Sequence, residues 1–417
     1  MAVVVAALLT LLITAAAPAQ NMQAPWVDQA DARIERHRMT DLRVIVVDAE
    51  GRPAPRAKVR VEQVRHDFPF GVVLDVADFE GGAQPGAARD DAPVWRCFNA
   101  VSLEQASAWP RVQAEPGQWD FTTVDDMLRW AERRGLVTRW GGLTSADPAR
   151  VPQWLLALQG KDLAGAVEDH VRTVLVRYGR RVQQFDVHTQ MFDHDLLASR
   201  LGEPMVRRLH EYAQAMGPDA RRSIRFEDGL VGARLQRMIE RVVEMREAFV
   251  PFDSVSVDQR FTGMILQSPL QKAVDALATL KIDVVVSNLE VSGPTPGAAA
   301  VNLEVVLRTL FADPTVRGIF LSGVTGGQFT DATAALLDDE GRPTPAGGVY
   351  EGLVRGRWWT DFTADADDLG NVQRRVMAGT YHLTALLPGG ATAETTVYLP
   401  VSLETRVVLL TALAEKR

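Results

Sequence analysis

The sequence predicts an α/β fold, in which a (β/α)8 TIM barrel carries a small discontinuous β-sandwich built from the N- and C-terminal segments. Strand-like and helix-like stretches alternate between residues 68 and 353, as in parallel βα units. No glycine-rich phosphate loop follows any of these strand-like stretches, which disfavours an open nucleotide-binding sheet. Near both ends of the chain, apolar and polar residues alternate with period two, as in half-buried strands.

Eight strand-like segments are predicted for the barrel domain, residues 68–353. They are residues 68–73, 97–103, 136–143, 183–188, 223–226, 254–257, 283–288 and 318–323. Because eight parallel units close a barrel, we expect the polar residues after these strands to meet at its carboxyl-end mouth.

Residues 41–66 and 358–413 are predicted to form the two halves of the β-sandwich. Residues 57–62 alternate strictly, and strand-like runs recur at 379–385, 394–400 and 404–410. Since a two-stranded hairpin alone is marginal in water, one sandwich with the barrel inserted between its halves is the economical interpretation. Two independent β appendages are the alternative.

The first residues have the pattern of an export signal. Residues 2–13 form an apolar run too short to span a bilayer, and the small residues Ala15-Ala16-Ala17-Pro18-Ala19 follow it. This pattern predicts a signal peptide over residues 1–19, cleaved near Ala19, and a secreted or periplasmic protein with no membrane span in the mature chain. No Lys or Arg precedes the apolar run, so a retained anchor or a mis-assigned start is the alternative.

Composition narrows the classes of partner. The 417 residues are 47% hydrophobic and 24% charged, with a formal net charge of −8, which is ordinary for a soluble protein. A mildly acidic chain without a basic stripe has no electrostatic reason to bind nucleic acid. Cys97 is the single cysteine, which excludes an internal disulfide, and we expect it to be a small buried hydrophobe. We expect no cofactor.

Two strand ends carry the most informative motifs, FDVHTQ at residues 185–190 and SNLEV at residues 287–291. They resemble the signature strands of glycoside hydrolase family 10, the endo-1,4-β-xylanase family, whose patterns are W-D-V-x-N-E and S/T-E-L-D-I/V. Residues 98–109, 115–121 and 335–346 resemble further motifs of this family in the same order. The resemblance implies a TIM barrel that takes a polysaccharide or oligosaccharide of plant type. In it, Gln190 stands at the position of the acid/base glutamate and Asn288 at that of the nucleophile.

The positions that hold the sugar in the family also depart from its pattern. Ala108 replaces a lysine, and Gly141 and Ser145 replace the histidine and tryptophan of R-G-H-T-L-V-W. Residues 258–260, DQR, stand where Q-x-H is expected, and residues 322–323, SG, replace W-G. The scaffold motifs persist while the strand tips change, which is typical of an altered site on a retained fold.

A retaining glycosidase needs one carboxylic acid to protonate the leaving oxygen and one carboxylate to attack the anomeric carbon, about 5–5.5 Å apart. Gln190 has no proton that it can release near neutral pH, and Asn288 has no anionic oxygen. The ordinary mechanism therefore does not survive these two replacements. Glu290 is the best displaced carboxylate, since residues two apart on a strand share a face, but it would lie roughly 6.6 Å beyond Asn288. A supporting role is the alternative for Glu290.

A metal site is a weaker possibility near the same mouth. His188, Asp193, His194 and Asp195 fall within eight residues, which suits an ion such as zinc. Their spacing matches no established ligand set, and helix capping explains the acidic residues equally well. We therefore assign no metal ligand.

Three functions fit these observations. The first is a non-catalytic protein that binds or senses a glycan. Its substrate-binding residues would be Glu104, Gln105, Asp258 and Arg260 together with Gln190 and Asn288, and Trp109 and Trp140 would offer stacking faces. The second is an active hydrolase that uses Glu290, Asp193 or Asp228 in an inverting arrangement, which needs carboxylates about 6.5–9.5 Å apart. The third is a scaffold or interaction protein that acts through the β-sandwich.

Overall fold

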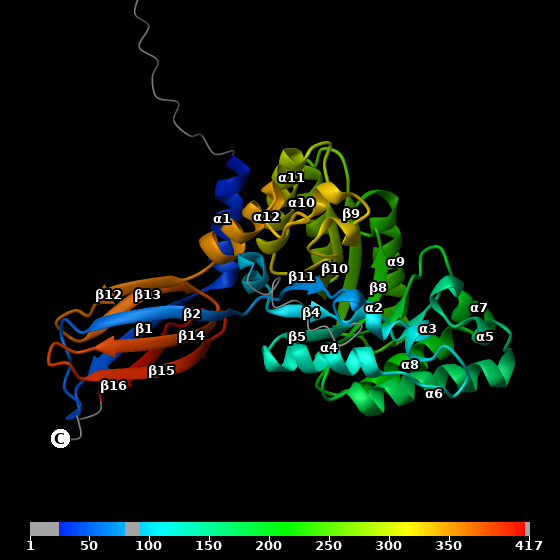
Figure 1. Cartoon of the computed structure of the whole chain (residues 1–417), viewed down its shortest axis with the longest axis horizontal. Helices are drawn as coiled ribbons and strands as arrows, with labels where there is room; N and C mark the ends of the chain where they lie inside the picture. Colours follow the sequence, from blue (N-terminus) through cyan, green and yellow to red (C-terminus); the bar gives the residue numbers. More distant parts are fainter. Residues whose placement is uncertain (1–24, 80–91, 413–417) are drawn as a thin grey trace, which may run out of the picture.

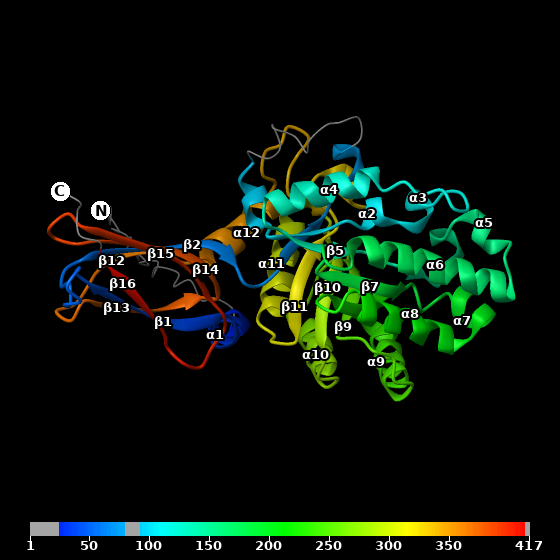
Figure 2. The ribbon, with the colours of Figure 1, turned by 90° about the horizontal axis from the view of Figure 1, so that it is seen from below.

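The computed structural model describes residues 25–79 and 92–412, so the predicted signal peptide lies outside the described residues. The chain forms two parts, a β-sandwich and a larger helix-covered barrel, which lie side by side along the long axis (Figures 1 and 2). Among the helices described, none is long and apolar enough to cross a membrane.

Eight parallel strands close the barrel, which confirms the predicted fold class. In order they are β3 (Phe70–Val73), β4 (Ala100–Ser102), β5 (Val137–Trp140), β7 (Gln184–Thr189), β8 (Arg221–Glu227), β9 (Ser254–Phe261), β10 (Asp283–Val291) and β11 (Val316–Leu321). The last strand pairs with the first through Ile319 and Phe70, and this pairing closes the sheet. The short β6 (Thr144–Ser145) adds a pairing beside β7.

Helices cover the outside of the barrel and bury its apolar strand residues (Figure 2). They are α2 (Glu104–Ser107), α3 (Trp109–Val112), α4 (Thr122–Arg133), α5 (Gln153–Leu156), α6 (Gly160–Tyr178), α7 (Leu196–Leu201), α8 (Glu203–Met216), α9 (Gly232–Glu247), α10 (Gln267–Ala278), α11 (Pro296–Phe311) and α12 (Pro345–Glu351), which continues into a π-helical turn, Gly352–Arg357. Cys97 is buried as expected, but it ends a 3-10 helix, Pro93–Cys97, rather than beginning a strand.

One helix precedes the predicted domains. α1 (Pro25–Arg38) buries Ala30, Ile34 and Arg38, which are four residues apart and therefore share one face. This face packs on α11, where Arg308 forms an ion pair with Asp31 at 2.8 Å.

Strands from both ends of the chain form one sandwich, as predicted, and the alternative of independent appendages is wrong. β1 (Met39–Val47) lies between β13 (Asn371–Met377) and β16 (Arg406–Thr411). The second sheet has the order β12 (Asp361–Asp365), β2 (Lys58–His66), β14 (Gly379–Leu386) and β15 (Thr392–Leu399). Alternate residues of β1 and β2 point inward to a shared apolar core.

The carboxyl ends of the barrel strands set the positions of the polar residues that matter below. Glu227 of β8, Asp258 of β9 and Asn288 of β10 lie at one level, since Asp258 is the register partner of both others. The pairing of β10 with β9 is irregular between Val286 and Asn288. Such an irregularity changes the direction of the side chains that follow it.

Candidate functional site

The barrel mouth holds an open polar cleft of about 520 Å³. It collects side chains from the carboxyl ends of all eight barrel strands and from the segments that follow them, namely Val73, Glu104, Gln105, Ala108, Arg150, Gln190, Glu227, Asp228, Asp258, Gln259, Arg260, Asn288, Glu290, Ser322, Gln328 and Thr330. Gln190 and Asn288 therefore line the same cleft, as the sequence predicted, and so do Glu104, Gln105, Asp258 and Arg260.

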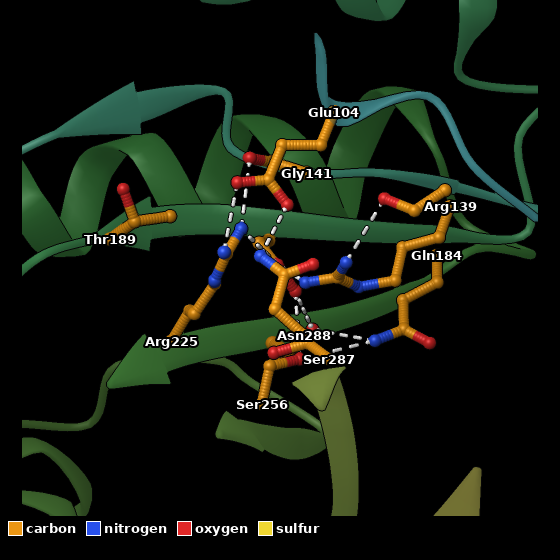
Figure 3. Close-up of polar contacts among 12 residues, drawn as sticks. Glu104, Arg139, Gly141, Gln184, Thr189, Arg225, Ser256, Ser287 and Asn288 are labelled. Atoms are coloured by element: carbon orange, nitrogen blue, oxygen red, sulfur yellow. Dashed lines mark hydrogen bonds and ion pairs between the residues drawn. The ribbon is translucent and has the colours of Figure 1, made fainter. Parts of the chain in front are cut away.

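Arg225 of β8 organises the floor of this cleft (Figure 3). Its guanidinium donates to Asp258 through Nε, at 2.8 Å from Oδ1, and to Glu104 through Nη2, at 2.9 Å from Oε1. Burial opposes the charge of Arg225, but these two carboxylates raise its pKa above the ordinary value. The arginine is therefore a fixed cation between two acidic residues that are 154 positions apart in the sequence.

Asn288 completes this network and leaves Glu104 without a free oxygen. Asn288 Nδ2 donates to Glu104 Oε2 at 2.9 Å, and the neighbouring Ser287 Oγ donates to Asp258 Oδ1 at 2.6 Å. Burial would raise the pKa of Glu104, but the charge of Arg225 and its hydrogen bond lower it to about 2. Glu104 is thus ionised over the whole neutral range, and it cannot serve as a general acid there.

A second arginine lies deeper in the barrel. Arg139 of β5 forms an ion pair with Asp186 of β7, and both side chains are fully buried. Ser223 and Ser256 each donate to Asp186 Oδ1 at 2.8 Å, so the carboxylate is well satisfied. Burial, and then the charge of Arg225, lower the pKa of Arg139 to about 9, which still leaves it protonated at neutral pH.

Glu227 is one of the cleft residues that were not predicted from the sequence. It ends β8, and burial, followed by the charge of Asp258, raises its pKa to about 7. The backbone N–H of Gln190 bonds to its carboxyl group. Gln190 itself has φ of +65° and Asp228 has φ of +47°, left-handed conformations that are strained for residues other than glycine. The signal was present, because two carboxylates directly follow the predicted strand 223–226, but only the second of them was considered.

Glu290, the predicted displaced carboxylate, holds a loop. Its two oxygens accept from the backbone N–H groups of Thr330, at 3.2 Å, and Asp331, at 3.0 Å. Arg260 lies 3.5 Å from it. These contacts match the supporting role that was the alternative for Glu290.

The prediction of a stacking face is wrong for Trp140. Its ring is 0% exposed and packs against Tyr178 of α6 and against Phe185. Successive residues of a strand face opposite sides of the sheet. Because Arg139 points into the barrel, Trp140 points toward the helix layer. Trp109 is buried as well; it stacks on His170 at 3.9 Å and does not line the main cleft.

The residues considered for a metal site are dispersed. His188 is buried beside Thr144, Asp193 pairs with Arg234 at 2.6 Å, and His194 lies 3.8 Å from Asp147. Burial lowers the pKa of His188 to about 4. Within residues 25–79 and 92–412, no group of three metal-binding side chains comes together.

Comparison with known proteins agrees with this architecture. The family model of Glycosyl hydrolase family 10 matches residues 61–347, more than half of the chain. The chain belongs to glycosyl hydrolase family 10. The fold of this family member is similar to that of xylanase 10B from Thermotoga petrophila, with a TM-score of 0.60 and 16% identity over 70% of this chain and 95% of that one. It is also similar to that of xylanase10C from Cellvibrio japonicus, with a TM-score of 0.60 and 17% identity over 70% of this chain and 71% of that one.

Two curated relatives of this family 10 chain carry names of different functions, one a regulator and the other an enzyme. It is 23% identical to the anti-sigma-I factor RsgI6 of Acetivibrio thermocellus over 365 residues, which are 87% of this chain and 47% of that protein. It is also 23% identical to endo-1,4-beta-xylanase 1 of Arabidopsis thaliana over 331 residues, 78% of this chain and 34% of that protein. The chain thus spans less than half of the length of each of these two relatives.

The structure explains one departure from the family 10 motifs. Gly141 stands where the resemblance places a histidine, and a Cβ atom at this position would lie 2.5 Å from the Cβ of Glu104. Glu104 therefore occupies the space that a side chain at position 141 would need.

Proposed function

We propose that this protein binds a neutral, β-linked polysaccharide of plant type in the barrel-mouth cleft without hydrolysing it, and that it acts outside the cytoplasm as a binding or sensing module. One observation carries the proposal. The cleft is open and polar, yet the two positions that would carry the acid/base and the nucleophile hold Gln190 and Asn288, and Asn288 is committed to Glu104.

Three further carboxylates of the cleft support the absence of ordinary turnover, because protein groups hold each of them. Glu104 and Asp258 are held by Arg225, and Glu290 is held by two backbone N–H groups. A retaining mechanism needs a nucleophile and an acid that are free to meet the same sugar. A relative named as an anti-sigma factor over most of this chain is consistent with sensing, and the export pattern of residues 1–19 is consistent with action outside the cytoplasm.

Two measurements test the proposal together. Purified protein is applied to a glycan array that includes xylan, arabinoxylan and mixed-linkage glucan, and the same preparation is incubated with xylan while reducing sugar is measured. We expect binding to at least one β-linked glycan and no release of sugar. No binding to any glycan would contradict the binding role.

Hydrolysis by displaced carboxylates is a second candidate, which Glu227 favours. A cleft carboxyl group with a pKa of about 7 is suited to general acid catalysis at neutral pH. Release of sugar by the wild type that is lost in both Glu227→Gln and Glu290→Gln would make this second candidate the function.

A further inference from the structure

A second cavity, of about 390 Å³, lies at the end of the barrel opposite the cleft, where the barrel meets the sandwich. The amino ends of β5, β7, β8, β10 and β11 supply part of its lining, and Ala378 and Val401 from the sandwich complete it. No described residue lines both this cavity and the cleft. Small-molecule pockets have volumes of this order and occur preferentially between domains.

Arg38, at the end of α1, brings a buried positive charge to this cavity. Its Nε donates to the carbonyl oxygen of Phe311 at 2.8 Å, and its Nη2 donates to those of Asp313, at 2.5 Å, and Val316, at 2.7 Å. The guanidinium also lies 4.7 Å from the ring centre of Phe68. Neutral carbonyl groups and a ring hold the side chain in place, but they do not balance its charge.

One nitrogen of this guanidinium is left over. Nη1 has no acceptor among the described residues, and unlike the buried Nε of Arg139 it remains accessible to solvent. Burial, and then the charge of Arg317, lower the pKa of Arg38 to about 9, so Arg38 stays charged at neutral pH. Asp67 and Asp283 also act on it through space, and like Arg317 they line the cavity. The open end of the guanidinium therefore faces the cavity.

Two further arginines of the lining share a single carboxylate. Arg221 Nη1 lies 3.0 Å from Asp283 Oδ2, and Arg317 Nε donates to Asp283 Oδ1 at 3.1 Å. The side chains of the two arginines are 38% and 48% exposed, so a ligand in the cavity can reach them. Asp67, the other acidic residue of the lining, accepts from Tyr398 of β15. Three arginines against two aspartates leave one positive charge here, in a chain whose net charge is −8.

The wall of the cavity near these charges is apolar. Pro69 and Val137 are partly exposed, and Val285 and Phe320, which pack with Val137, are buried. Covering such surface favours a ligand that carries an apolar part. Guanidinium groups bind carboxylates through paired N–H donors. The lining therefore suits one negative carboxylate on an apolar body.

We infer that this cavity binds a small organic monocarboxylate. Its carboxylate group is held by Arg38 Nη1 together with Arg221 and Arg317, and its apolar body lies against Pro69 and Val137. The inference is independent of the glycan binding proposed above. Because the bound molecule contacts the barrel and the sandwich together, it stabilises the folded chain at their junction.

The test is calorimetric titration of the full chain with benzoate and with hexanoate, at pH 7 and constant ionic strength. Benzamide, a neutral molecule of nearly the same shape as benzoate, is the matched ligand control. We expect saturable binding of at least one of the two carboxylates, with one molecule per chain. We expect benzamide and hexanamide to bind at least about tenfold more weakly, because they have no charge for the arginines to pair with.

Substitutions in the lining should change the affinity in both directions. Arg317→Gln should weaken binding about fivefold, and Asp283→Asn should strengthen it about threefold because it frees both arginines. Arg221→Gln combined with Arg317→Gln leaves Arg38 against two aspartates and should abolish binding. Arg207→Gln, which breaks an exposed pair on α8, is the matched control and should bind as the wild type does.

Either of two results would overturn the inference. The first is that the wild type binds neither carboxylate at millimolar concentration. The second is that the amides bind as tightly as the acids, or that the double arginine variant, folded as judged by circular dichroism, binds like the wild type. Glycan binding on the array should be the same in all these variants, so the proposed function stands or fails separately.

Discussion

Arg139 and Arg225 project into the same barrel from β5 and β8, but one is sealed in the core and the other lies under an open cleft. Arg139 and its partner Asp186 are both 0% exposed, whereas Glu104 and Asp258, the partners of Arg225, are 12% and 17% exposed. Burial lowers the pKa of Arg139, while two carboxylates raise that of Arg225. The deep pair is part of the barrel core, and the upper cluster lies at the open cleft.

The largest effect is expected at the deep pair. Asp186→Asn keeps the shape of the side chain but leaves Arg139 buried without a counter-charge, so the free energy of unfolding should fall by about 3–5 kcal/mol. Urea denaturation measures this change. Asp126→Asn, which breaks an exposed pair with Arg129 on α4, is the control and should cost less than about 1 kcal/mol. Equal effects of the two substitutions would contradict a structural role for the deep pair.

A smaller effect is expected at the cleft cluster. Arg225→Met leaves Glu104 and Asp258 without their cation, and because both are partly exposed we expect a loss of roughly 2–3 kcal/mol at pH 7, below the range for a fully buried pair.

The pH dependence of this variant distinguishes the charge from simple packing. In the wild type, the pKa of Glu104 is lowered from 4.5 to about 2, so its contribution to stability is present above pH 4.5 and is lost as the pH falls toward 2. In Arg225→Met, burial without the cation raises that pKa. The deficit of the variant should therefore shrink between pH 7 and pH 3 in urea denaturation at each pH. A constant deficit would show that only packing had changed.

The smallest effect is expected from restoring the two carboxylates. Gln190→Glu with Asn288→Glu should recover little or no xylan hydrolysis, because a carboxylate at position 288 replaces the amide that donates to Glu104 and places two anions together. Gly141 and Ser145 also leave the sugar without its family contacts, and binding of the transition state depends on such contacts. Release of reducing sugar from xylan is the measurement. Rates typical of active xylanases would show that the carboxylates alone had been lost.

Part of the site could be predicted from the sequence. Gln190, Asp258 and Arg260 follow predicted strands and Asn288 ends one, and in a closed barrel such residues share one mouth, as they do here. Trp140 could not be placed in this way, because alternation along β5 separates its two faces without saying which one lies inside. Helix α1 was missed because only three spaced residues of a largely polar segment are buried.

By itself, the sequence determined the eight barrel strands, the halves of the sandwich, and the presence of amides at two strand tips. These properties depend on local periodicity and on the identity of single residues. Only the tertiary structure decided that Arg225 holds Glu104, 121 residues away, and that Glu227 lies beside Asp258 with an unsatisfied oxygen. Ionisation and hydrogen bonding depend on burial and on distances through space, and these are set by how the barrel closes.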